Sequence, residues 1–193
     1  MATRREQILA AAARRFAAHG FHGVSIDEIG SDLGITGPAL YHHFPSKDAI
    51  LAELLVGISQ TLLDEGRRRT EEATSPADAV EQLIAWHIDF AVEHPDLIVI
   101  QARDLASLSS SDRNQVRGLQ RRYVAIWTEV IVAYTGTDRA NGEVAAHAAF
   151  GLLNSTPHLV RLPAQRKRRV LREMGHGALA AVRASRPVPE VTG

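Results

Sequence analysis

The sequence predicts an all-α protein of about nine helices. Apolar residues recur at spacings of three and four in nearly every segment, and no convincing alternation of apolar and polar residues indicates a strand. The 193 residues are 45% hydrophobic and 23% charged, which is typical of a folded protein rather than a disordered one. A chain of this length can bury a full core without disulfides or metals.

Capping residues mark the starts of the first three helices. Thr3 with Glu6, and Ser25 with Glu28, have the spacing of a capping box, and Thr36 is a suitable N-cap for the third helix. A glycine follows each of the first two apolar patterns, as expected at a helix C-terminus. We therefore expect helices over 3–19, 25–33 and 36–44.

Six further helices are predicted from caps and periodicity. Ser46 can cap a long helix over 47–72, which carries leucine and isoleucine residues on one face. Ser75-Pro76 begins the next helix, and His94-Pro95 ends it. The remaining helices are expected over 97–105, 112–134, 141–160 and 164–183, and the tail 184–193 is expected to be disordered.

The composition excludes several classes of function. The chain has no cysteine, which excludes disulfide scaffolds, cysteine-zinc sites, iron–sulfur clusters and thiol catalysis. No apolar run is long enough for a transmembrane helix, and the first residues lack the apolar core of a signal peptide, so a cytoplasmic protein without membrane association is expected. The 22 basic and 22 acidic side chains cancel, so any binding of nucleic acid must come from a local patch.

Residues 25–44 have the layout of a helix-turn-helix. Two short helices meet across a three-residue turn, with Gly30 where they approach closely and Gly34 where the turn requires a positive φ. Ile35 and Leu40 supply apolar contacts at the turn and within the second helix. Such a motif presents the N-terminal end and one outer face of its second helix to the major groove of DNA.

Six residues of this region are candidates for contact with DNA. Ser25 and Lys47 begin helices, where phosphate can be bound, and the others lie on the turn and on the side expected to be exposed. The set is Ser25, Thr36, Gly37, Tyr41, His42 and Lys47. The alternative is a purely structural corner. The net charge favours this alternative, because residues 1–50 carry five basic and five acidic side chains and are therefore net neutral.

At these residues the chain resembles the TetR family of bacterial transcriptional regulators. The resemblance is carried, within Arg5–Leu51, by Ile8-Leu9-Ala10-Ala11-Ala12, Phe16, Gly20-Phe21, Val24-Ser25, Ile29-Gly30, Gly34-Ile35-Thr36, Leu40-Tyr41, His43-Phe44, Ser46-Lys47 and Leu51. It implies a homodimer with a DNA-binding domain, here 1–46, and a ligand-binding and dimerisation domain, here 47–183. It also implies a repressor that a small molecule releases from a palindromic operator, with the six candidates at DNA-facing positions.

Three residues depart from the family pattern. Pro38 stands where glycine is frequent, Gly30 replaces a commoner alanine, and Gly37 offers no side chain to a base. We therefore expect fewer direct base contacts from the second helix than the motif usually provides.

The last two helices are the candidates for a dimer interface. Their small and apolar residues permit close approach, and two such helices from each subunit would form a four-helix bundle. The selected residues are Val144, Ala148, Leu152, Leu171, Met174 and Ala178. The alternative is that these faces complete the core of a single chain.

A ligand pocket is expected among the helices of 47–134. Its candidate lining residues are Trp86, Phe90, Tyr123, Trp127 and Asn154, with Gln101 and Arg103 as polar anchors. The apolar lining favours a hydrophobic effector such as a fatty acid or acyl-CoA ester. The alternative is that aromatic residues at this spacing form an ordinary core.

No catalytic or metal-binding motif accompanies these features. The nine histidines include no HExxH or His-x3-His pair, and no phosphate loop or nucleophile elbow is present, so we predict no cofactor and no enzyme. Our hypothesis is a dimeric, ligand-responsive DNA-binding regulator. An all-α enzyme, or a helical interaction module without operator binding, remains as the alternative.

Overall fold

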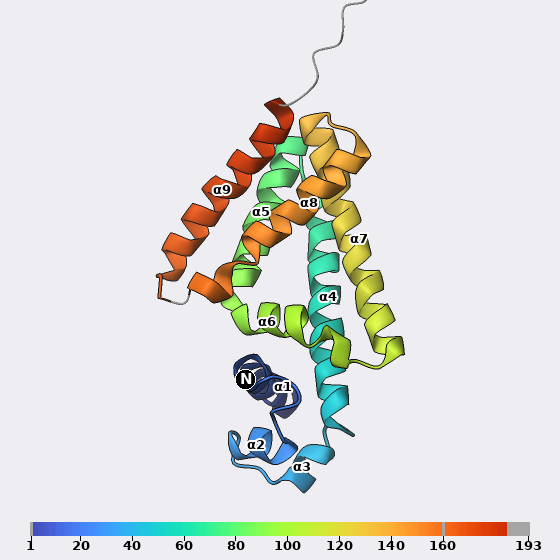
Figure 1. The fold of residues 1–193 in the computed structure, drawn as a ribbon, viewed down its shortest axis with the longest axis vertical. Helices are drawn as coiled ribbons and strands as arrows, with labels where there is room; N and C mark the ends of the chain where they lie inside the picture. Colours follow the sequence, from blue (N-terminus) through green and yellow to red (C-terminus); the bar gives the residue numbers. More distant parts are fainter. Residues whose placement is uncertain (1, 160, 185–193) are drawn as a thin grey trace, which may run out of the picture. The chain divides into compact units, whose positions relative to one another are not determined.

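The computed structural model describes residues 2–159 and 161–184, and within these ranges it contains nine α-helices, two short 3-10 turns and no strand (Figure 1). The predicted fold class is confirmed. The predicted disordered tail lies outside the described residues, except for Ala184, which ends the last helix. The elements are α1 (Arg4–His19), α2 (Ile26–Ser31), α3 (Gly37–Tyr41), α4 (Lys47–Glu72), α5 (Pro76–Glu93), α6 (Pro95–Arg103), η1 (Leu105–Ser107), α7 (Ser110–Thr135), α8 (Arg139–Leu153), η2 (Thr156–Leu159) and α9 (Ala164–Ala184).

The chain divides into two compact units. The first comprises the residues up to Thr61 together with His94–Gln120, and the second comprises Leu62–Glu93 and the described residues from Arg121 onward. The helices α4 and α7 each contribute to both units. The unit that holds the helix-turn-helix is thus larger than the predicted 1–46, because α6 packs against α1.

The core of the first unit is built from one apolar stripe of each short helix. Ile8 and Phe16 of α1, Ile29 of α2 and Leu40 of α3 are fully buried, as is Phe44 in the turn that leads to α4. These are the positions at which helical spacing places apolar side chains on one face. Both predicted capping boxes are present at the starts of α1 and α2.

In the second unit, α9 packs against α5 and α8 (Figure 1). The core of this unit includes Leu83 and Ile84 of α5, Leu153 of α8, and Leu171 and Leu179 of α9. Ion pairs at the margin of this core join α9 to α5. The Nε of Arg168 lies 2.6 Å from Oδ1 of Asp89, and its Nη2 lies 2.7 Å from Oε1 of Glu93.

Several helix boundaries differ from those predicted. Helix α7 begins at Ser110, because Ser109 caps it by accepting a hydrogen bond from the Asp112 N–H at 3.1 Å. Helix α8 begins at Arg139 after the cap Asp138, and it ends at Leu153 instead of continuing through Pro157. Of the helices in the described ranges, none is both long and apolar enough to span a bilayer.

Candidate functional site

The corner between α2 and α3 has the geometry of a helix-turn-helix. Gly34 has a φ of 66°, as predicted, and the Ile35 N–H donates to the carbonyl oxygen of Gly30 at 3.0 Å. The backbone of the turn lies so close to α2 that a Cβ at Gly30 would be 2.6 Å from the Ile35 oxygen. Thr36 caps α3, because its Oγ1 accepts from the Ala39 N–H at 3.4 Å. The local signals in the sequence thus predicted this corner correctly.

Four of the predicted DNA-facing residues lie at the surface of the first unit. The side chains of Ser25, Thr36, Tyr41 and His42 are exposed, and Tyr41, with 53% of its surface accessible, is one of the few large exposed hydrophobic residues. Tyr41 and His42 lie at the end of α3, and Thr36 lies at its start. An aromatic ring and polar groups are therefore presented together by α3 and its N-cap.

Gly37 does not lie on the exposed surface, contrary to our expectation. It is buried, and a Cβ added there would overlap Oδ1 of Asp27 on α2. The missing side chain allows the Asp27 carboxylate to lie against the first turn of α3. Gly37 is therefore a packing residue.

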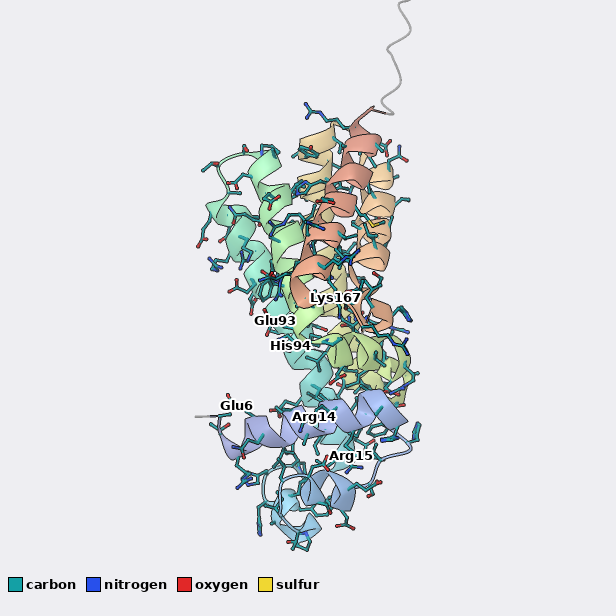
Figure 2. The ribbon with its side chains drawn as sticks, turned by 90° about the vertical axis from the view of Figure 1, so that its left-hand side faces the viewer. Glu6, Arg14, Arg15, Glu93, His94 and Lys167 are labelled. Atoms are coloured by element: carbon teal, nitrogen blue, oxygen red, sulfur yellow. The ribbon has the colours of Figure 1, made fainter. Side chains whose placement is uncertain are left out.

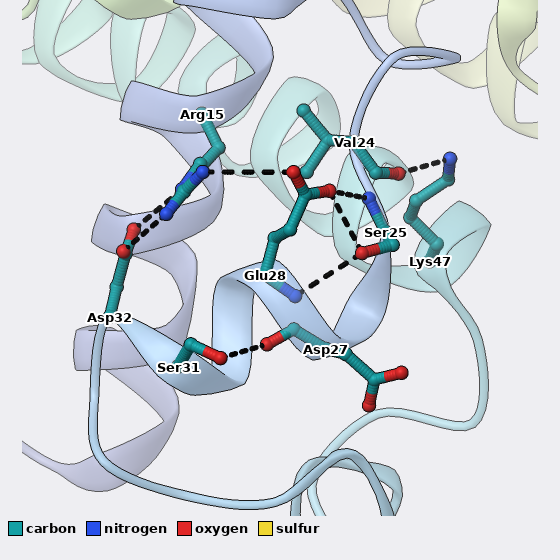
Figure 3. Close-up of polar contacts among 8 residues, drawn as sticks. All are labelled: Arg15, Val24, Ser25, Asp27, Glu28, Ser31, Asp32 and Lys47. Carbon is teal, nitrogen blue, oxygen red and sulfur yellow. Dashed lines mark hydrogen bonds and ion pairs between the residues drawn. The ribbon is translucent and has the colours of Figure 1, made fainter.

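Lys47 also differs from the prediction of an exposed phosphate contact. Its ammonium group donates to the carbonyl oxygen of Val24 at 2.7 Å (Figure 3). It also donates to the carbonyl oxygen of Phe21 at 2.9 Å and lies 4.5 Å from the centroid of the Phe21 ring. These contacts hold the segment that connects α1 to α2. The ammonium group of Lys47 is thus bound by groups of the protein itself, which lie more than twenty residues away in sequence.

Ion pairs neutralise much of the remaining charge of this unit. Arg15 donates to both carboxylate oxygens of Asp32, at 2.8 and 2.6 Å, and its Nη1 lies 3.9 Å from Oε1 of Glu28 (Figure 3). The hydrogen bonds from Arg15 lower the pKa of Asp32, and those from the N–H and hydroxyl of Ser25 lower the pKa of Glu28. Arg14 extends from α1 in Figure 2, and among the described residues no hydrogen bond or ion pair engages it. The charge of Arg14 nevertheless acts on Asp32, since it also lowers the pKa of that carboxyl.

Arg103, predicted as a polar anchor for a ligand, is a structural residue of the first unit. Its guanidinium donates to the carbonyl oxygens of Phe16 and Ala17 at the end of α1, and it pairs with Asp104. Asp104 is buried and also accepts from the Phe21 N–H at 3.4 Å. Gln101 lies on the same helix in this unit. Both residues therefore belong to a different unit from the aromatic residues with which we had grouped them.

The other predicted ligand-binding residues gather in the second unit around His87. The rings of Phe90, Tyr123 and Trp127 have centroids 6.5, 5.9 and 5.9 Å from that of His87. The ring of Trp86 contacts Phe90, and Asn154 hydrogen-bonds to His87. His87 itself was not among the predicted binding residues, nor was Phe150, whose ring centroid is 5.1 Å from that of His87. Both occupy apolar helical positions, and this pattern is the signal that could have identified them.

The polar atoms of this aromatic cluster form a short buried chain. Nε2 of His87 donates to Oδ1 of Asn154 at 2.9 Å, and Nδ1 accepts from the Tyr123 hydroxyl at 3.2 Å, as in a neutral ring. Burial lowers the pKa of His87 to about 4, against a smaller opposing effect of the bond to Asn154. Burial also raises the pKa of Tyr123. In addition, the indole N–H of Trp86 is buried without an acceptor in the described structure. The cluster is thus apolar with a few polar atoms at defined positions.

Comparison with known proteins identifies both parts of the chain. Residues 8–54 match the sequence model of bacterial regulatory proteins of the tetR family, and residues 73–158 match the tetracyclin repressor-like C-terminal domain. The chain belongs to the TetR family.

Individual TetR-family relatives are distant. The repressor KstR2 of Mycolicibacterium smegmatis is 28% identical over 134 residues, which are 67% of this chain and only 64% of that protein. The solved structure of the regulator PfmR from Thermus thermophilus is 25% identical, with a TM-score of 0.79 over 93% of this chain and 97% of that one. The structure of AibR in complex with isovaleryl coenzyme A and operator DNA is 20% identical, with a TM-score of 0.74 over 89% and 97% of the two chains. This last likeness concerns the fold alone.

The dimer candidates of this TetR-family chain divide between surface and core. Val144 and Met174 are exposed to 68% and 52%, and the side chains of Ala148 and Ala178 are exposed as well. Leu152 is half-buried. Leu171, by contrast, is 2% exposed, so its assignment to an interface is wrong. It lies on the stripe of α9 that packs inside the second unit.

Proposed function

We propose that this protein is a sequence-specific DNA-binding transcriptional regulator that acts as a repressor in the cytoplasm. The observation that carries the proposal is the exposed group of Thr36, Tyr41 and His42 on a helix-turn-helix corner. Hydroxyl, phenol and imidazole groups can hydrogen-bond to phosphates and base edges, and such a helix presents its N-terminal end, here Thr36, and one outer face to the major groove. Ser25 contributes a hydroxyl group at the start of α2. Membership of a family of regulators favours this function over an all-α enzyme.

The first test is a gel-shift titration with the DNA that flanks the protein's own gene. A regulator of this kind retains a discrete complex in excess nonspecific DNA, at both about 0.05 and 0.2 M salt. The double variant Tyr41→Ala/His42→Ala should abolish this complex while leaving the melting temperature unchanged, because both side chains are exposed. A helical interaction module without operator binding would give no discrete complex with either protein.

We further propose that the protein is a homodimer through exposed residues of α8 and α9. Val144 and Ala148 lie one turn apart on α8, as do Met174 and Ala178 on α9, and all four are exposed in the single chain. Exposed apolar residues at this spacing favour a helix-to-helix interface. A twofold dimer binds two half-sites related by symmetry, so the operator should be palindromic.

The effector that we propose is a fatty acid or its CoA ester, bound within 47–183 at the aromatic cluster. The apolar rings favour an acyl chain, and the unpartnered indole N–H of Trp86 offers a donor for a carbonyl oxygen. The complex of the similarly folded AibR with isovaleryl coenzyme A supports an acyl-CoA as one form of this effector.

Decanoic acid and decanoyl-CoA serve as probes for this binding. Each should raise the melting temperature, since it binds the folded state, and should change the fluorescence of Trp86 and Trp127. Release from DNA requires tighter binding to the form that cannot bind DNA, so the same compound should also dissociate the gel-shifted complex. Stabilisation without release would contradict the coupling, and no response to either compound would contradict the effector class.

A further inference from the structure

Asp27 lies where α2 meets the start of α3. It is the second residue of α2, it is exposed, and its carboxylate lies against Gly37, the first residue of α3. In the close-up view this carboxylate points away from the ion pairs of Arg15 (Figure 3). Its oxygen overlaps the position that a Cβ of residue 37 would take. Asp27 therefore supplies a polar group at the point where α3 itself has none.

Asp27 differs from the two neighbouring acidic residues in having no counter-charge. Glu28 is bound by Ser25 and lies near Arg15, and Asp32, directly after the helix, is paired with Arg15. Within the described residues, no hydrogen bond or ion pair engages the carboxylate of Asp27. Its backbone oxygen accepts from the Ser31 hydroxyl, but this bond leaves the side chain unaffected.

An unpaired carboxylate is unfavourable on a surface that approaches DNA, because the phosphates repel it. The repulsion is offset only if the carboxylate meets a hydrogen-bond donor. In the major groove the donors are the exocyclic amino groups of cytosine and adenine. On adenine the neighbouring N7 is an acceptor, which would repel the second carboxylate oxygen. Cytosine has no acceptor beside its amino group on that edge.

We propose that Asp27 is a specificity-determining residue that accepts a hydrogen bond from the amino group of one cytosine in each operator half-site. The inference rests on the proposed function, because it requires the α2–α3 corner to face DNA. It deepens that function by naming one base and the residue that selects it. Guanine and thymine present acceptors at this edge. The carboxylate repels these acceptors and therefore also disfavours both bases.

The test is selection of duplexes from a random pool, followed by sequencing, with full-length wild type, Asp27→Ala and Asp48→Ala. Asp48 is an exposed acid in the first turn of α4, so its removal changes the charge of the unit equally. We expect the wild type to select a palindrome with a cytosine at one position of each half-site. Asp27→Ala should lose that preference, on the order of tenfold, and keep the other positions. Asp48→Ala should select the wild-type motif.

Gly37→Ala provides a second, independent perturbation. Its methyl group must displace the Asp27 carboxylate, so it should weaken the preference at the same base pair while Asp27 itself is retained. Circular dichroism melts of all variants show whether the first unit is folded. If Asp27→Ala selects the wild-type motif unchanged, the role of Asp27 is wrong although the protein binds DNA. If the wild type enriches no motif, the proposed function itself fails.

Discussion

At the scale of single residues, Lys47 links the start of α4 to the segment between α1 and α2. Because its ammonium group donates to two backbone carbonyl oxygens, Lys47→Ala should lower the free energy of unfolding by about 1–3 kcal/mol. Urea denaturation monitored by circular dichroism measures this loss. Lys47→Met keeps much of the contact with the Phe21 ring and isolates the contribution of the charge.

Lys47→Met also distinguishes a lysine that binds the protein's own carbonyl groups from one that binds a DNA phosphate. Removal of a lysine that neutralises a phosphate reduces the magnitude of the slope of log K against log salt by about one. We expect the slope of Lys47→Met to equal that of the wild type, since the charge is engaged by Phe21 and Val24. An unchanged stability combined with a reduced slope would restore Lys47 as a phosphate contact.

His87 makes the stability of the protein depend on pH. Its pKa is about 4 in the folded protein and about 6.5 when unfolded, so the unfolded chain binds the extra proton between these values. The stabilisation is therefore complete above pH 6.5 and is lost as the pH falls toward 4, by about 3 kcal/mol at most. Denaturant titrations from pH 7 to pH 4 measure this decrease.

A matched pair of variants assigns the effect to His87. His87→Gln keeps hydrogen-bonding atoms near Tyr123 and Asn154 but does not titrate, so its stability should decrease less steeply in acid than that of the wild type. His158→Gln removes an exposed histidine, and the stability of this variant should depend on pH as steeply as that of the wild type. Equal slopes for wild type and His87→Gln would show that the buried ring is not responsible.

At the scale of elements, the α2–α3 corner depends on one backbone conformation. Gly34 has a positive φ, and no heavy atom lies within 4 Å of the position of an added Cβ. Gly34→Ala should therefore cost about 1–2 kcal/mol through the backbone alone. Gly57→Ala is the control, because this exposed helical glycine has the same free space without the positive φ. It should stabilise the protein by about 0.5–1 kcal/mol.

Both variants are measured by thermal unfolding and by gel shift. Gly34→Val should lose DNA binding as well, because a β-branched side chain is least tolerated in the left-handed region. Equal stability changes at residues 34 and 57 would mean that the turn is not built on the left-handed conformation.

The features that the sequence predicted are local ones. Capping boxes, the glycine of the turn and the apolar spacing lie within a few residues of their effects, and they located α1 to α4. The roles of Lys47 and Arg103 could not be predicted in this way, because the backbone carbonyl groups to which they donate lie 23 to 87 residues away. Only the packed structure brings a lysine of α4 to the carbonyl groups after α1.

Amphipathic spacing also left the orientation of α9 undetermined. Leu171 and Met174 are three residues apart and both apolar, so periodicity treats them as one face. The structure places Leu171 against the core and Met174 at the surface, since α9 packs on α5 and α8 with one stripe only. The second stripe is the one that we assign to the dimer.

For the whole molecule, this assignment predicts that some substitutions prevent dimer formation and that others prevent folding. Val144→Glu/Met174→Glu should be a folded monomer by multi-angle light scattering at micromolar concentration, because two charges would be buried at an apolar interface. The melting temperature of the monomer reports its fold. Leu171→Asp should instead unfold the second unit, since it buries a charge within the chain. A dimeric double variant would place the interface on other surfaces.

We propose that this TetR-family protein binds one DNA sequence in preference to others. This preference is measured as the ratio of two dissociation constants, which are determined by fluorescence anisotropy at physiological salt. One is for the duplex that the wild type selects from a random pool, and the other is for the same duplex with its half-sites scrambled. We expect a ratio of about 10³ or more. A ratio near one would contradict it.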